Sequence, residues 1–259
     1  MFLNNQTHFQ RGKVMPVQIK ISQDNESWVR EAAAEVVEQV KKTPASRLSF
    51  ATGATTLPLF DELVKLNHAG EIDFSKVSTF QLDEYHGLER DNPASCAFTI
   101  KDRFYNHINI RPENCFFLDS KCIDPEDHCR EYEALIRDGG GIDLQVLGIG
   151  LNGHIGFNQP GTQFTIETHP AEVDDFTWEK NTKFFKSVAE NPREALTMGT
   201  GTIMSAKKIL LLANGSGKKD IVCKALFGPV SPDIPASVLQ NHPDLIVILD
   251  PSLSKLCSP

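Results

Sequence analysis

A histidine in a glycine-rich stretch is the first candidate for chemistry in this sequence. His154 lies in residues 143–162, DLQVLGIGLNGHIGFNQPGT, where the apolar run 144–147 is followed by glycines at every second or third position. The run is typical of a buried parallel strand, and the glycines let the backbone turn sharply and approach a ligand. Ligands of open α/β sheets bind beyond the carboxyl ends of the strands, so His154 is expected at such a site. From the spacing alone, a loop histidine satisfied by backbone groups is an equally good interpretation.

Two adjacent carboxylates, Asp83 and Glu84, follow a second expected strand at residues 77–82. Neighbouring side chains on an extended backbone point to opposite sides, so at most one of the two is expected to face a site. The alternative is a helix-capping Asp83 beside a solvated Glu84.

A third group of residues could hold a phosphate. Residues 47–51 read as a strand that runs into Thr52-Gly53-Ala54-Thr55-Thr56, and a helix is expected to follow. A strand, a small polar loop and a helix present backbone N–H groups and hydroxyls to a phosphate. This signal is weak on its own because many strand-to-helix turns look similar.

The elements that must position these residues alternate between strands and helices. Strands are expected at residues 17–21, 47–51, 77–82, 115–118, 144–147, 208–213 and 245–249. Helices are expected at residues 26–42, 57–66, 94–107 and 124–137, and after residue 219. Residues 162–182 and 193–206 give no clear assignment. The alternation predicts a single α/β domain with a Rossmann-like, open, mostly parallel sheet flanked by helices. We expect this domain to span residues 17–259 and residues 1–16 to form a flexible extension.

Composition and charge narrow the classes of function. The net charge of −8 argues against a nucleic-acid surface. The same charge repels anions, so an anionic ligand must be held by local hydrogen-bond donors and cations. No run approaches the length of a membrane span, and the N-terminus lacks the apolar core of a signal peptide, so a cytoplasmic protein is expected. The six cysteines show no zinc spacing, and their one local cluster is Cys122 and Cys129 with His128 beside the latter. A metal there is the alternative to free thiols in a reducing compartment, which are expected. We therefore expect neither a metal nor a cofactor.

Several motifs together resemble one family, the glucosamine-6-phosphate deaminases, which are also called isomerases. The motifs are Ala51-Thr52-Gly53-Ala54-Thr55, Leu82-Asp83-Glu84-Tyr85, residues 150–158 (GLNGHIGFN), Ala195-Leu196-Thr197-Met198-Gly199, Gly215-Ser216-Gly217-Lys218 and Ile234-Pro235-Ala236-Ser237. They follow the order of the family from about residue 20 to residue 249, so the match is specific.

The resemblance implies conversion of an amino-sugar 6-phosphate, of glucosamine or galactosamine, to a ketose 6-phosphate and ammonia. It gives His154 the ring-opening proton relay, which a neutral imidazole can perform, and Asp83 the base that moves a proton between C2 and C1. The implied catalytic residues are Asp83, Asn152, His154 and Gln159. The implied substrate-binding residues are Thr52, Gly53, Ala54, Thr55, Glu84, Gly153, Lys183 and Lys218. We expect the loop 52–56 and the two lysines to converge on one anion site.

Two positions depart from the pattern of the family. Lys183 stands where an Arg is familiar, so the charge is kept and the planar two-point grip is lost. Gln159 stands where the family usually has a Glu that orients the histidine and supports its charged form. Glutamine cannot carry that charge, so the pKa of His154 is expected to be lower than in relatives with Glu. If the fold is intact, Gln159 should lie within hydrogen-bonding reach of His154 or of the substrate's hydroxyls.

Two alternative functions remain open. A 6-phosphogluconolactonase has a similar fold, but its glycine-His loop usually continues with Thr-Ala-Ser, whereas this chain continues with Ile155-Gly156-Phe157-Asn158. A non-catalytic sugar-phosphate sensor on the same scaffold would not need Asp83 and His154, although Gln159 keeps that alternative open. The sugar epimer and a homo-oligomeric state are left undecided. Residues 165–171 are poor in Lys and Arg, which argues against a second, regulatory phosphate site.

Overall fold

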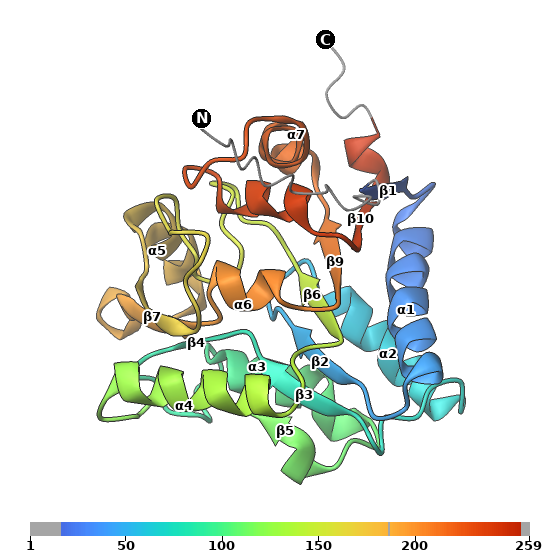
Figure 1. The fold of residues 1–259 in the computed structure, drawn as a ribbon, viewed down its shortest axis with the longest axis horizontal. Helices are drawn as coiled ribbons and strands as arrows, with labels where there is room; N and C mark the ends of the chain where they lie inside the picture. Colours follow the sequence, from blue (N-terminus) through green and yellow to red (C-terminus); the bar gives the residue numbers. More distant parts are fainter. Residues whose placement is uncertain (1–16, 186, 255–259) are drawn as a thin grey trace, which may run out of the picture.

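The computed structural model describes residues 17–185 and 187–254. The extension expected at residues 1–16 lies outside the described residues. The described chain is a three-layer α/β structure with a central sheet between two layers of helices, and a small second sheet lies beside it (Figure 1). The predicted fold class is confirmed.

The central sheet has seven strands in the described part of the chain, in the order β1-β10-β9-β6-β2-β3-β5, and all its pairings are parallel. The strands are β1 (Gln18–Ile21), β2 (Arg47–Phe50), β3 (Ser78–Gln81), β5 (Cys115–Phe116), β6 (Leu144–Leu147), β9 (Lys208–Ala213) and β10 (Leu245–Leu249). Parallel strands need crossover connections, which here are mostly helices. The four central strands β9, β6, β2 and β3 therefore end side by side at one edge.

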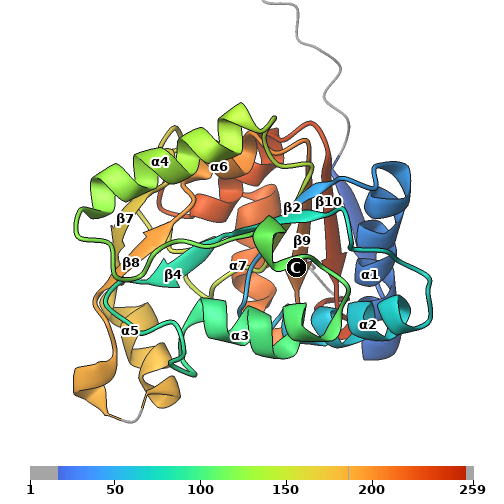
Figure 2. The same ribbon diagram turned by 90° about the horizontal axis from the view of Figure 1, so that it is seen from below.

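Both faces of this sheet are buried, and successive residues of a strand serve opposite layers. In β9, Leu210 and Leu212 pack into one hydrophobic cluster, whereas Ile209 and Leu211 pack into the other. Helices α1 (Asn25–Lys42), α2 (Leu57–His68) and α3 (Cys96–Arg103) cover the first face. Helices α4 (Pro125–Asp138), α6 (Thr200–Met204) and α7 (Lys219–Phe227) cover the second. Figure 2 shows α4 and α6 on the side of the sheet opposite to α1, α2 and α3.

The N-termini of four helices are capped by the side chain that precedes them. Each cap oxygen accepts a hydrogen bond from the backbone N–H three residues further on; the pairs are Asp24 with Ser27, Ser95 with Phe98, Asp124 with Asp127, and Asp174 with Thr177. The last cap opens α5 (Asp175–Asn181), which follows the second sheet.

The second sheet is antiparallel, in the order β4-β8-β7, with strands β4 (Asp83–Tyr85), β7 (His169–Glu172) and β8 (Glu194–Thr197). Only Leu82 separates β3 of the central sheet from β4, so Asp83 is the first residue of the second sheet. Asp83 lies opposite Thr197, which in turn lies opposite His169. This sheet and α5 form one end of the molecule (Figure 1).

Most of the expected elements are confirmed, with three differences. The helix expected at 94–107 ends at Arg103 and is followed by a separate turn of 3₁₀ helix at Tyr105–His107. The strand expected at 115–118 is only Cys115–Phe116. The two unassigned segments contain β7, α5, β8 and α6. Their strands are only four residues long and depend on pairing with each other and with β4, which local sequence does not reveal.

The cysteine prediction is partly wrong. Cys96, Cys115, Cys122 and Cys129 are free, as expected, but Cys223 forms a disulfide, and Cys257 lies outside the described residues. Spacing along the chain does not show which thiols the fold brings together, so this bond could not be anticipated. None of the described helices is long and apolar enough to span a membrane.

Candidate active site

The candidate site lies beyond the carboxyl ends of β9, β6, β2 and β3, where four loops meet. Lys218, after β9, donates a hydrogen bond from Nζ to Thr55 Oγ1, in the loop after β2, at 2.9 Å. Thr55 in turn donates to Asn214 Oδ1 at 2.9 Å. The expected approach of Lys218 to the loop 52–56 is thus confirmed. That the two hold a phosphate stays a prediction.

The loop after β2 is shaped for an anion. Thr56 Oγ1 bonds the carbonyls of Ala51 and Gly53, which folds the loop into a tight turn, while Gly53 and Ala54 remain exposed. Helix α2 begins next and has no side-chain cap, and since Pro58 has no N–H, the N–H groups of Leu57 and Leu59 are those its first turn can offer to a ligand. Burial lowers the pKa of Lys218, and the nearby Asp250 opposes that effect.

The imidazole of His154 is held by Asn152. Asn152 Oδ1 lies 2.7 Å from His154 Nδ1 and also accepts the backbone N–H of His154 at 3.2 Å. Gly150 permits this arrangement, because an added Cβ there would overlap the imidazole ring. Since an amide oxygen only accepts, Nδ1 must carry the proton, which leaves Nε2 as the basic nitrogen.

His154 is neutral near pH 7. Burial lowers its pKa to about 4, against the opposing charge of Asp174 and with a further lowering by Lys218. A neutral imidazole with a basic Nε2 can take a proton from one oxygen and return it to another.

Gln159 makes no hydrogen bond with His154. Its Oε1 accepts from Asn152 Nδ2 at 3.0 Å and from Thr177 Oγ1 at 3.4 Å, and both of these residues contact His154 Nδ1. Its Nε2 is buried and has no hydrogen-bond partner among the described residues. The expected direct contact with the imidazole is therefore absent, and a contact with substrate hydroxyls stays a prediction.

Asp83 has the environment of a base that works near neutral pH. Burial, reinforced by the charge of Glu84, raises its pKa to about 7, and a hydrogen bond from the Cys96 thiol opposes the rise. Cys96 is the first residue of α3, and its thiol also meets the hydroxyl of Thr52. Burial raises the pKa of this thiol well above its usual value, so the thiol remains a protonated donor.

Glu84 points away from Asp83 and is fully buried, as the alternation along a strand requires. Its carboxylate accepts five hydrogen bonds within the protein, from Gln81 Nε2, Tyr85 N, Ser95 Oγ, Cys96 N and Ala97 N. Both oxygens are thereby used at the N-terminus of α3. The expectation that Glu84 binds substrate is not supported, and neither is the alternative of a solvated Glu84 beside a capping Asp83.

Gly153 and Lys183 are the remaining expected residues. The carbonyl of Gly153 accepts the N–H of Ala236 at 2.9 Å, so the segment after Ile234 anchors the histidine loop. Lys183 is exposed on a 3₁₀ turn, Thr182–Phe184, that follows α5. Its place at a phosphate stays a prediction.

Sequence reasoning missed Cys96, Asp174 and Thr177. Asp174 and Thr177 fall in the segment that could not be assigned, although an Asp three residues before a Thr is a recognisable N-cap signal. Cys96 follows a similar cap at Ser95, but nothing local reveals that the chain brings its thiol to Asp83.

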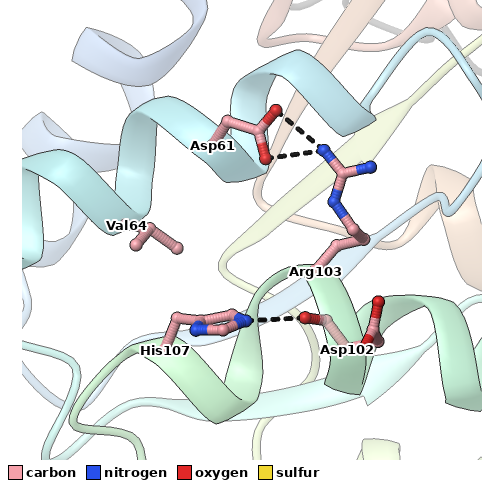
Figure 3. Close-up of a pocket in the computed structure, with 5 residues that line it drawn as sticks. All are labelled: Asp61, Val64, Asp102, Arg103 and His107. Atoms are coloured by element: carbon pink, nitrogen blue, oxygen red, sulfur yellow. Dashed lines mark hydrogen bonds and ion pairs between the residues drawn. The ribbon is translucent and has the colours of Figure 1, made fainter.

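A separate surface pocket of about 400 Å³ lies between α2 and α3 and contains none of the expected site residues (Figure 3). Polar side chains that line the pocket are hydrogen-bonded to other residues of its lining. Arg103 is paired with Asp61 at 2.8 Å, and His107 Nε2 bonds the backbone oxygen of Asp102 at 2.8 Å. We assign no function to it.

The fold and the site define an α/β enzyme with two acid–base groups beside a loop suited to an anion. The family model for glucosamine-6-phosphate isomerases and 6-phosphogluconolactonase matches residues 23–247. The chain belongs to this family.

Its relatives favour one branch of the family. The glucosamine-6-phosphate deaminase of Clostridium perfringens is 42% identical over 91% of this chain and 98% of its own. That of Clostridium botulinum is 44% identical over 90% of this chain and 96% of its own. A solved structure described as a monomeric glucosamine-6-phosphate deaminase is 39% identical, with a TM-score of 0.90 over 93% of this chain and 100% of that chain. The 6-phosphogluconolactonase of Thermotoga maritima, 16% identical with a TM-score of 0.72 over 90% of this chain and 99% of that chain, shares the fold.

Proposed function

We propose that this protein is a glucosamine-6-phosphate deaminase that converts the amino-sugar phosphate to a ketose 6-phosphate and ammonia. One observation carries the proposal. Asp83, with a pKa raised to about 7, and a neutral His154 with a basic Nε2 follow β3 and β6, the two neighbours of β2, and β2 leads into the loop where Thr55 accepts a hydrogen bond from Lys218. The extensive identity to named deaminases supports the same activity.

The first step is ring opening. His154 Nε2 accepts the proton of the anomeric hydroxyl and returns it to the ring oxygen as the C1–O5 bond breaks, which yields the open-chain aldehyde. The low pKa of His154 suits this relay because the imidazole is neutral when the closed sugar binds.

Isomerisation and loss of nitrogen follow. Asp83, when ionised, removes the proton from C2 while the aldehyde oxygen takes up a proton, which gives an enolamine. Asp83 then delivers its proton to C1 as the amino group loses one, so that C1 becomes CH₂OH and C2 becomes an imine. Water adds to C2 and ammonia leaves, which gives the ketone. A carboxylate with a pKa near 7 is a suitable base because it is ionised at neutral pH and still binds the proton strongly.

The phosphate is assigned to the loop 52–56, to the free N-terminus of α2 and to the charge of Lys218. Lys183 is proposed as a second cation. Backbone N–H groups at a helix start and a lysine together can hold a dianion without help from the overall field, which is repulsive at a net charge of −8.

The test is ammonia release from glucosamine 6-phosphate and from galactosamine 6-phosphate, with solvent deuterium incorporation at C1 of the product. Release from the glucosamine epimer with incorporation supports the proposal. Hydrolysis of 6-phosphogluconolactone in its place would assign the chain to the other branch. Binding of the sugar phosphate without turnover would favour a sensor.

A cytoplasmic location belongs to the same proposal. Four free thiols agree with a reducing compartment, whereas the disulfide at Cys223 does not. The oligomeric state is open; the deaminase of the matching solved structure is described as monomeric.

A further inference from the structure

The position that usually supplies a carboxylate near the histidine is occupied here by Gln159, yet a different carboxylate lies close by. Asp174 Oδ2 accepts a hydrogen bond from Asn152 Nδ2 at 2.7 Å, and Asn152 Oδ1 faces His154 Nδ1 at 2.7 Å. The three side chains form one continuous chain of hydrogen bonds from a carboxylate to the imidazole. Asp174 comes from the start of α5, far along the sequence from the histidine loop.

The orientation of the Asn152 amide follows from its neighbours. Its Nδ2 faces two acceptors, Asp174 Oδ2 and Gln159 Oε1, and its Oδ1 faces the backbone N–H of His154. Turning the amide over would place its oxygen against the carboxylate and its NH₂ group against the backbone N–H. Asp174 therefore fixes the amide, and the amide fixes the protonated nitrogen of the imidazole.

The charge of Asp174 also acts on the imidazole. It is the group that raises the pKa of His154 against burial and Lys218, and it does so through the one intervening amide. Thr177, whose N–H is capped by the other oxygen of Asp174 at 2.6 Å, lies 3.5 Å from His154 Nδ1 and closes the arrangement.

We propose that Asp174 is the positioning carboxylate of the ring-opening histidine: through Asn152 it holds His154 in the tautomer with a basic Nε2 and stabilises the cation that forms during proton transfer. Acting through Asn152, Asp174 supplies the negative charge that Gln159 cannot carry. The expected changes in turnover rest on the proposed function, whereas the expected tautomer of His154 is independent of it.

The first experiment separates this role from helix capping. Asp174→Ser keeps a hydroxyl that can cap α5 but is too short to reach Asn152. In side-chain ¹⁵N NMR, His154 of the unaltered protein should show a protonated Nδ1 and a bare Nε2, and Asp174→Ser should increase the Nε2–H form. Turnover should fall at least 10-fold with little change in KM. Asp124→Ser, which alters the equivalent cap of α4, is the matched control and should leave turnover unchanged.

The second experiment moves the charge. Asn152→Asp alone brings two carboxylates to the distance now spanned by a 2.7 Å hydrogen bond, and turnover should drop sharply. In Asn152→Asp/Asp174→Asn the donor and the acceptor are exchanged, the cap is retained and the charge stands next to His154. The double variant should recover turnover to within a few-fold of the original.

Two results would overturn the proposal: an unchanged tautomer in Asp174→Ser, or a double variant no more active than Asn152→Asp. A protein that releases no ammonia from either epimer would refute the proposed function, while the NMR measurement would still decide the role of Asp174.

Discussion

The thiol of Cys96, the first residue of α3, interacts with the carboxylate of Asp83, the first residue of β4, and opposes the rise in the pKa of that carboxyl. Glu84, the neighbour of Asp83, binds the backbone N–H of Cys96 at 3.0 Å. The two consecutive carboxylates of β4 thus meet the same helix start in different ways. The start of α3 fixes the position of Glu84 by hydrogen bonds, and it lowers the pKa of Asp83 through the Cys96 thiol.

Loss of the thiol should change the pH dependence of the enzyme. Its hydrogen bond favours the ionised form of Asp83, so Cys96→Ala should raise the pKa of Asp83 above about 7. Because the base must be ionised, the acid limb of kcat/KM should move to higher pH. Cys96→Ser retains a donor and should move the limb less. Equal pH profiles for Cys96→Ala and the original protein would contradict the assignment.

Asp83 should cost the protein stability at neutral pH. Its pKa is near 3.8 in the unfolded chain and about 7 in the folded one, so the folded state binds the proton more tightly. This contribution is fully present below pH 4 and is lost as the pH rises through 7, by about 4 kcal/mol in total. Asp83→Asn should therefore raise Tm at pH 8 and change it little at pH 4, while it abolishes exchange of the C2 proton and leaves substrate binding nearly intact. An equal change of Tm at both pH values would show that ionisation of Asp83 does not destabilise the folded state.

Glu84 should behave as a structural anion. Glu84→Gln replaces a buried acceptor of five hydrogen bonds, and it should lower the free energy of unfolding by about 2–4 kcal/mol. It also removes the charge that raises the pKa of Asp83, so the acid limb of kcat/KM should move to lower pH, opposite to Cys96→Ala. Urea unfolding and a pH profile of the same preparation test both effects. Complete loss of C2 proton exchange in a folded Glu84→Gln protein would mean that the base has been assigned to the wrong carboxylate.

Lys218 should contribute to binding of the phosphate. Lys218→Met removes a charge-assisted contact and should weaken substrate binding by about 1.5–3 kcal/mol, seen as a rise in KM and a loss of competitive inhibition by inorganic phosphate. Lys224→Met, an exposed lysine of α7, is the control and should leave both unchanged. Retained phosphate inhibition in Lys218→Met would place the anion elsewhere.

Gln159→Glu tests whether the family's carboxylate can be restored. The new charge would face two donors, Asn152 Nδ2 and Thr177 Oγ1, and would act on His154 through them. Turnover should rise, by up to the ~10²–10⁴-fold typical of acid–base groups, and more in kcat than in KM. The gain should be larger when Asp174 is changed to Ser than in the original protein. An unchanged or lower turnover in the Asp174→Ser background would favour a protein adapted to another ligand.

The central sheet was predictable from local signals, namely apolar strands and small polar loops, whereas the approach of Lys218 to the loop 52–56 was implied by the resemblance to the family. The role of Glu84 and the contacts of Cys96 were not predictable, because they arise when α3 returns to the end of β3. Asp174 was hidden for the same reason. Its cap signal is local, but its contact with Asn152 exists only when α5 packs against the histidine loop.

The second sheet joins Asp83 mechanically to Asp174, the carboxylate behind the imidazole of His154. Asp83 begins β4, and Asp174 follows β7 by two residues, while β8 pairs with both strands. Leu82 alone joins β4 to the central sheet, whereas Thr55, His154 and Lys218 all follow strands of that sheet. A small rotation of the second sheet would therefore move Asp83 and Asp174 together, relative to a phosphate held by the loop 52–56 and Lys218.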